Sequence, residues 1–241
     1  MKIYSKTDVG KKRYNNQDSF TVGSFDNGAV FAVVCDGMGG ANGGNIASQM
    51  AIKIISDYII NSYSPKMNSN SIENMLRAAV DTANFSIYER SKSDNELSGM
   101  GTTVVATLIC DNLVHIVHVG DSRAYLATSE TLDRLTVDHS LVQKMINNGE
   151  ISEEEAFSHP KKNVITRAVG TDSTVISDYN IAIKPENNVV LICTDGLTNL
   201  VNENEICNTI RNVKPEECVD ILVNMANENG GSDNITVVLI Y

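Results

Sequence analysis

The chain has 241 residues, 42% of them hydrophobic, and a formal net charge of −11. This length suits one domain, residues 1–241, with a substantial core. The negative charge argues against nucleic acid or an anionic membrane as a partner, and no apolar stretch approaches the roughly 18 residues that span a bilayer.

Three segments show the apolar spacing of amphipathic helices, which bury one face. The first covers residues 44–60 and the second covers residues 71–88, with Ser71 as the expected N-cap. The third begins at Pro215, a residue suited to the first turn of a helix, and carries an apolar stripe from Cys218 to Ala226.

Six short runs rich in β-branched residues predict strands between these helices. They cover residues 30–35, 102–110, 113–119, 124–127, 189–193 and 235–240. Asp111-Asn112 separates two of these runs and is typical of a tight hairpin, which favours antiparallel pairing. The order of elements does not alternate strand and helix regularly. We therefore expect an α+β fold in which helices cover antiparallel sheets.

The segment 140–162, which we call the flap segment, differs in composition from the rest of the chain. It is polar, contains three consecutive glutamates at residues 153–155, and has little core-forming pattern after Ile146. We expect a partly helical surface excursion here and not a second domain.

The five cysteines predict a reducing environment. Their number is odd, no Cys-x-x-Cys spacing occurs, and Cys35, Cys110 and Cys193 lie in or at the ends of apolar runs. Such cysteines behave as small hydrophobic residues, and the pattern argues against disulfides or a zinc site. The N-terminal residues contain no apolar signal core. We therefore expect a cytoplasmic protein.

Four aspartates follow or precede apolar runs directly. Asp36, Asp121 and Asp195 come at or just after the ends of such runs, and Asp233 precedes the last one. Carboxylates at the ends of buried strands are costly to desolvate unless they have partners. The chain offers few cations nearby, so bound metal ions are the natural compensation.

The ligand chemistry indicates a hard cation. Carboxylates with glycine neighbours, whose carbonyl groups are accessible, suit Mg²⁺ or Mn²⁺ better than zinc. His115 and His118 are three apart on a predicted strand and point to opposite faces, so we expect them to be packed or exposed and not ligands. A single Asp-Gly pair usually marks only a turn, but four such carboxylates favour a metal site.

Eight segments in one order resemble the metal-dependent protein phosphatase family, also called PPM or type 2C, and especially its compact bacterial members. The segments are Arg13-Tyr-Asn-Asn-Gln-Asp18, Asp36-Gly-Met-Gly-Gly40, Met100-Gly-Thr-Thr103, Val119-Gly-Asp-Ser-Arg123, Asp138-His-Ser140, Asn163 to Gly170, Cys193-Thr-Asp-Gly196 and Gly231-Ser-Asp-Asn234. The resemblance covers residues 7–241. It implies a four-layer α/β/β/α sandwich of two antiparallel sheets flanked by helices, with the metal site at one edge.

The resemblance also implies a ligand set for two Mg²⁺ or Mn²⁺ ions. Asp36 would bridge the two ions, and Gly37 would contribute its carbonyl oxygen. Asp195 and Asp233 would complete the shell of one ion, and Asp18 would support the other through water. A water between two such ions loses a proton readily, and the hydroxide attacks phosphorus in line.

Three further roles follow from the resemblance. Asp121 together with Asp195 would hold a third, weaker ion. Arg13 would hold phosphate oxygens, since a guanidinium group matches them bidentately; the alternative is an ordinary surface arginine beside two lysines. His159, in the flap segment, would contact substrate; a solvent-exposed side chain without a role is an equally good interpretation.

The implied function is metal-dependent hydrolysis of phosphoserine and phosphothreonine in proteins. The implied partners are phosphoprotein substrates and a cognate bacterial Ser/Thr kinase, and we expect a monomer. Members of the family often carry a histidine, as a candidate acid, where this chain has Met38 and Ala41. Two alternatives therefore stay open: a catalytically weak sensor or binding module with this fold, and a hydrolase of small phosphoesters.

Overall fold

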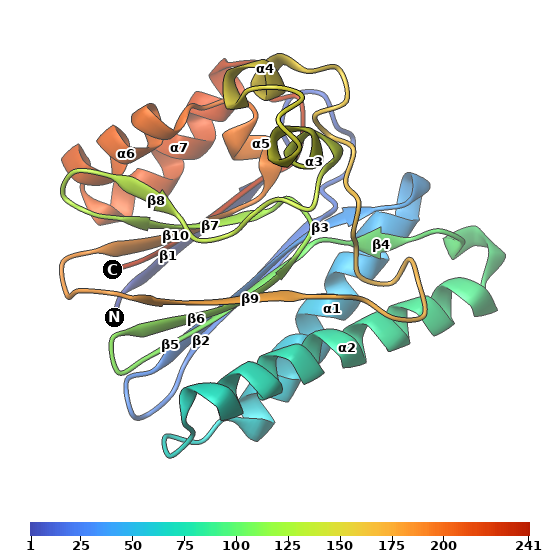
Figure 1. The fold of residues 1–241 in the computed structure, drawn as a ribbon, viewed down its shortest axis with the longest axis horizontal. Helices are drawn as coiled ribbons and strands as arrows, with labels where there is room; N and C mark the ends of the chain where they lie inside the picture. The colour runs from blue at the N-terminus through green and yellow to red at the C-terminus, as the bar shows by residue number, and fades with distance from the viewer.

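Two antiparallel sheets packed face to face form the centre of the computed structural model of the chain (Figure 1). The structure describes the backbone of residues 1–241 and all side chains except those of residues 41 and 42. The first sheet consists, in spatial order, of β1 (Ile3–Asp8), β11 (Ile235–Ile240), β10 (Val189–Cys193), β7 (Arg123–Ala127) and β8 (Leu132–Arg134). The second consists of β2 (Asp18–Ser24), β3 (Val30–Met38), β5 (Val104–Cys110), β6 (Leu113–Val119) and β9 (Asp178–Ile183), with β4 (Gly101–Thr102) beside β3.

Helices cover the outer face of each sheet. The long helices α1 (Gly40–Ser62) and α2 (Ser69–Ser93) lie on the second sheet, and α6 (Glu203–Asn212) and α7 (Pro215–Glu228) lie on the first (Figure 1). The chain also contains α3 (Leu141–Asn147), α4 (Glu153–Ser158), α5 (Asp195–Thr198) and the 3₁₀ turn η1 (Asn95–Leu97). The predicted α+β fold of two antiparallel sheets flanked by helices is confirmed.

The apolar core has three parts, one for each interface between layers. One lies between the second sheet and the pair α1 and α2, and another lies between the first sheet and the pair α6 and α7. The third lies between the two sheets and consists mainly of β-branched side chains such as Val34, Val105, Ile116, Ile192 and Val238. Every interior strand is thus buried on both faces, which explains its continuous apolar sequence.

The predicted elements differ from the observed ones mainly at their ends. Helix α2 begins two residues before Ser71, and its N-cap is Asn68, whose side chain accepts a hydrogen bond from the Ser71 N–H at 2.9 Å. Pro215 starts α7 as expected. Asp111 and Asn112 both have positive φ, which is the conformation of a tight two-residue hairpin turn.

The flap segment contains α3 and α4 and lies above the end of the sandwich at which α5 is found (Figure 1). Helix α4 has a complete capping box, in which Ser152 and Glu155 bond each other's backbone N–H groups. None of the helices described is at once long and apolar enough to cross a lipid bilayer.

Candidate metal centre

The two sheets bring carboxylates together at one edge of the sandwich. Asp18 is the first residue of β2 and lies opposite Asp36 of β3. Asp195 starts α5 directly after β10, Asp233 lies just before β11, and Asp121 lies between β6 and β7. All of these except Asp18 line one pocket of about 370 Å³. The structure therefore gathers the carboxylates predicted from strand ends, although they lie up to two hundred residues apart in sequence.

Two glycines let the backbone approach closely at this edge. A Cβ atom on Gly37 would lie 2.0 Å from the carbonyl oxygen of Gly44, and one on Gly196 would lie 1.9 Å from that of Asn234. Only glycine fits either position without movement of the backbone. Gly37, predicted as a carbonyl ligand, lines the same pocket as the carboxylates.

Asp18 connects the two sheets. Its Oδ2 accepts hydrogen bonds from the hydroxyl groups of Thr194 and Thr236, at 2.8 and 2.6 Å, while its Oδ1 is buried and has no partner. Burial raises the pKa of Asp18 to about 7, the two hydroxyl groups oppose this shift, and the charge of Asp195 adds to it. A charged Asp18 is therefore costly in this protein unless a cation lies beside Oδ1.

The other carboxylates of the cluster, the buried Asp121 and the half-buried Asp36 and Asp195, repel one another in the same way. Burial raises the pKa of Asp36 and of Asp121 well above the ordinary range, and neighbouring carboxylates add to both shifts. Burial, together with the charge of Asp233, raises the pKa of Asp195 to about 6. Because burial and mutual repulsion act together, bound cations would relieve both costs at once.

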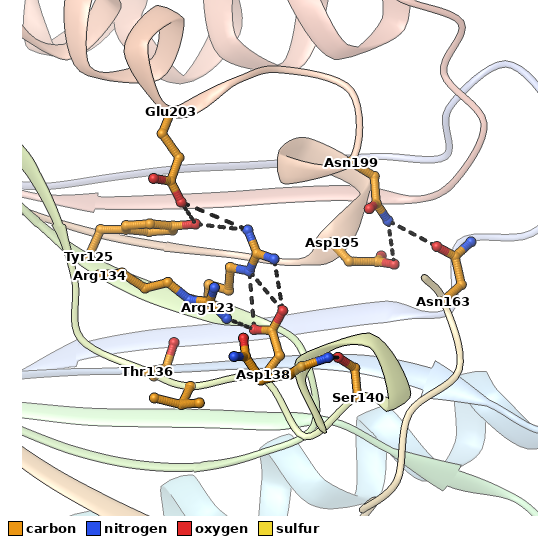
Figure 2. A network of polar contacts seen from close by, with 12 residues as sticks. Arg123, Tyr125, Arg134, Thr136, Asp138, Ser140, Asn163, Asp195, Asn199 and Glu203 are labelled. Carbon is orange, nitrogen blue, oxygen red and sulfur yellow. Dashed lines mark hydrogen bonds and ion pairs between the residues drawn. The ribbon is translucent and has the colours of Figure 1, made fainter. Parts of the chain in front are cut away.

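Asn199 holds one oxygen of Asp195 (Figure 2). Its side-chain amide donates to Oδ2 of Asp195 at 2.8 Å and lies 3.4 Å from the Oδ1 of Asn163, which follows the flap segment. The other oxygen of Asp195 is buried and unpartnered. Asn199 is the C-cap residue of α5 and follows Asp195 by four residues, one helical turn. This spacing is the sequence signal that would have identified it.

Arg13 lies at the rim of the same pocket. Its Nη2 donates to Oδ2 of Asp233 at 2.8 Å, and this hydrogen bond is the main reason that the pKa of Arg13 is raised. The side chain is about half exposed, so the ion pair itself contributes little stability. Only one guanidinium nitrogen is engaged, which leaves further N–H donors for an anion in the pocket.

His159 and Met38 differ in their position relative to the carboxylate pocket. His159 follows α4, and its Nδ1 accepts the backbone N–H of Lys161 at 3.1 Å. It is not among the residues that line the carboxylate pocket, whereas Met38 is. The Ala41 side chain, where the family's acid is expected, lies outside the described residues.

A second network fixes the base of the flap segment (Figure 2). Arg123 binds the buried carboxylate of Asp138, with 2.7 Å between Nη2 and Oδ2, and Arg134 binds the same carboxylate from the other side. The hydroxyl group of Tyr125 donates to Glu203 at 2.9 Å, which ties β7 to α6. Sequence reasoning quoted Asp138 within a motif but assigned no role to it.

His118, His139 and Asp178 are close enough together to hold an ion. The guanidinium group of Arg167 already binds Asp178, with 2.8 Å between Nη1 and Oδ1, and stands 3.1 Å from His139 Nε2. The Nδ1 of His139 accepts the Gly120 N–H, so in the neutral ring the proton is on Nε2 and faces Asp178. We assign this cluster to the packing of the loop before Asp121.

The comparison with known proteins gives consistent matches over nearly the whole chain. The family model described as protein phosphatase 2C matches residues 10–238. The serine/threonine phosphatase stp of Listeria monocytogenes is 38% identical over 236 residues, which cover 98% of this chain and 93% of the relative. The protein phosphatase PhpP of Streptococcus pneumoniae is 35% identical, with 100% of this chain and 97% of the relative covered.

Solved structures agree with the fold. The serine/threonine phosphatase of S. agalactiae superimposes with a TM-score of 0.92 at 35% identity and covers 100% of this chain and 98% of its own. The catalytic domain of the phosphatase PstP, solved in complex with 2 manganese ions, superimposes with a TM-score of 0.84 at 29% identity and covers 99% and 96%. This chain belongs to the protein phosphatase 2C family.

Proposed function

We propose that this protein phosphatase removes phosphate from phosphoserine and phosphothreonine in proteins, with Mn²⁺ or Mg²⁺ held by the carboxylate cluster. The observation that carries the proposal is the pair of buried, unpartnered carboxylate oxygens, Oδ1 of Asp18 and Oδ1 of Asp195, within a group of carboxylates that repel one another. This donor set consists of oxygen atoms only and fits hard divalent cations. Similar proteins are named serine/threonine phosphatases, and their family depends on metal ions.

In this proposal Asp36 and the carbonyl group of Gly37 would help to hold two divalent ions. Asp195 and Asp233 would be further ligands of one ion, and Asp18 would support the other through water. When bound, such ions lower the pKa of a coordinated water and supply the hydroxide that attacks phosphorus.

A third ion would use Asp121 together with Asp195. Because Asn199 occupies Oδ2 of Asp195, the free oxygen for this ion is Oδ1. Because Asp195 would also serve the first pair of ions, we expect this third site to bind more weakly.

Arg13 orients the phosphate group in this proposal. Its bond to Asp233 holds the guanidinium group at the rim of the pocket. Its remaining N–H groups would donate to phosphate oxygens. Met38 also lines the pocket but has no proton to give, so the leaving alkoxide takes its proton from water or from another residue.

We propose that residues 1–241 form a single catalytic domain, that the protein is a monomer, and that a Ser/Thr kinase phosphorylates its substrates. The five cysteines are all free and buried, which supports a reducing cytoplasmic environment. His159 stays a candidate substrate contact of the flap segment.

The test measures phosphate release from a phosphothreonine peptide after EDTA treatment and after return of Mn²⁺ or Mg²⁺. We expect no turnover without the ion and recovery with it, and no recovery in Asp36→Asn or Asp233→Asn. Ion binding without turnover would instead favour the sensor module. Turnover of p-nitrophenyl phosphate without turnover of any phosphopeptide would favour a hydrolase of small phosphoesters.

A further inference from the structure

A groove lies directly beside the carboxylate pocket and has no part in the chemistry described above. It has a volume of about 360 Å³ and is lined by Met38 and by residues 165–168, 171–172 and 174–176; we call it the Ile176 groove. Met38 and Ile165 also line the carboxylate pocket, so the two cavities share a wall. A molecule bound over the metal centre therefore lies next to the groove.

The shared wall is built by close packing over a glycine. Met38 lies opposite Gly101 in the β3–β4 pair. A Cβ atom on Gly101 would stand 2.8 Å from the Cγ2 of Thr171 and 3.1 Å from the Cε of Met38. The missing side chain at residue 101 thus lets Met38 and Thr171 pack over this position beside the groove.

The groove has a mixed lining, in which Met38, Ile165, Val175 and Ile176 offer apolar side chains. Its one cation, Arg167, is engaged by Asp178, and its one carboxylate is the exposed Asp172. The Ile176 side chain forms part of the lining and is 72% exposed, so its aliphatic surface is available to a bound molecule. Thr166, also in the lining, has a buried hydroxyl oxygen without a hydrogen-bond partner.

The geometry points to the occupant: we propose that the Ile176 groove binds an apolar side chain of the phosphoprotein substrate, two residues from the phosphorylated residue. In an extended peptide, side chains two residues apart lie on the same face, about 7 Å apart. A phosphoryl group over the carboxylate pocket therefore places such a neighbour over the adjoining groove. The volume of the Ile176 groove lies near the lower end of the range for ligand-binding pockets, which suits one or two side chains. This inference rests on the proposed function.

The experiment combines a peptide series with a matched pair of variants. The peptides carry one phosphothreonine and have leucine, glycine or aspartate two residues before or after it. Ile176→Asp places a carboxylate in the groove, and because Ile176 is exposed we expect no change in melting temperature. The control is Ile183→Asp at the end of β9, where an isoleucine of similar exposure, 69%, lies outside the groove.

With the wild-type protein and Mn²⁺, we expect leucine at one of the two positions to raise kcat/KM about tenfold over glycine, as partial burial of one aliphatic side chain allows. Ile176→Asp should remove this gain and leave p-nitrophenyl phosphate turnover unchanged. Ile183→Asp should keep the gain.

Two results would overturn the inference: equal kcat/KM for the leucine and glycine peptides, or a leucine gain that persists in Ile176→Asp. The failure of the proposed function looks different. In that case the wild-type protein would hydrolyse none of the phosphopeptides, whatever residue they carry at these positions.

Discussion

Asp18→Asn should stabilise the metal-free protein at alkaline pH. Burial raises the pKa of Asp18 from its ordinary value of 3.8 to about 7, so the folded state keeps a proton that the unfolded state releases between these values. The stability that this proton provides is complete below pH 4 and is lost as the pH rises through 7. Asparagine stays neutral at every pH, and its oxygen can still accept from Thr194 and Thr236.

The magnitude follows from the two pKa values. One pKa unit corresponds to about 1.36 kcal/mol, and two units separate pH 5 from the folded-state pKa. The advantage of Asp18→Asn over the wild type should therefore grow by roughly 3 kcal/mol between pH 5 and pH 8. For a chain of this size, that is a difference of roughly 6–12 °C in melting temperature.

Scanning calorimetry of EDTA-treated protein at pH 5 and pH 8 measures this difference. The control is Asp81→Asn, at an exposed position on α2, which should shift the melting temperature equally at both pH values. With saturating Mn²⁺ the order should reverse, since Asp18 then has a cation near its free oxygen. An Asp18→Asn protein that is no more stable than the wild type at pH 8 without metal would refute the reasoning about burial.

Three other predictions concern single residues of the site. Arg13→Lys should lower kcat/KM for p-nitrophenyl phosphate about 10- to 100-fold, because an ammonium group cannot donate two parallel hydrogen bonds to phosphate as a guanidinium group does. Equal rates would show that Arg13 is only a surface residue. Asp121→Ala should keep two tight ions in calorimetric titrations with Mn²⁺ and lose one weak ion, and loss of all binding would contradict this assignment. Ala41→His should raise kcat/KM for phosphoserine peptides far more than for p-nitrophenyl phosphate, whose phenolate leaves without a proton; equal gains would mean that another group already gives the proton.

The sequence predicted the interior strands of both sheets and not the outer ones. The strands β3, β5, β6, β7, β10 and β11 each have neighbours on both sides and read as continuous apolar runs. The four that were not predicted, β1, β2, β8 and β9, are the edges of the two sheets. Their side chains are mostly half-buried or exposed, so their sequences lack the apolar run that marks a buried strand.

The site also contains both residues that a local sequence signal predicts and residues that it does not. An aspartate at the end of an apolar run is a local signal, so Asp36, Asp121, Asp195 and Asp233 could be found from the sequence. The Ile176 groove could not be found in this way, because Met38 and residues 165–176 meet only after β3, β4 and the chain beyond the flap segment have packed.

The position of Asp18 connects metal binding to the packing of the sheets. Asp18 belongs to β2 in one sheet, whereas its partners Thr194 and Thr236 follow β10 and lie in β11 of the other. Its free Oδ1 is therefore held at the junction of the sheets by bonds that an ion does not replace. A chain whose sheets had separated at this edge would lose the hydroxyl donors and the carboxylates of Asp195 and Asp233 together. Ions that bind this arrangement and not the unfolded chain must stabilise the packing of one sheet on the other. The free energy of this stabilisation grows with the logarithm of the ion concentration once that concentration exceeds the Kd.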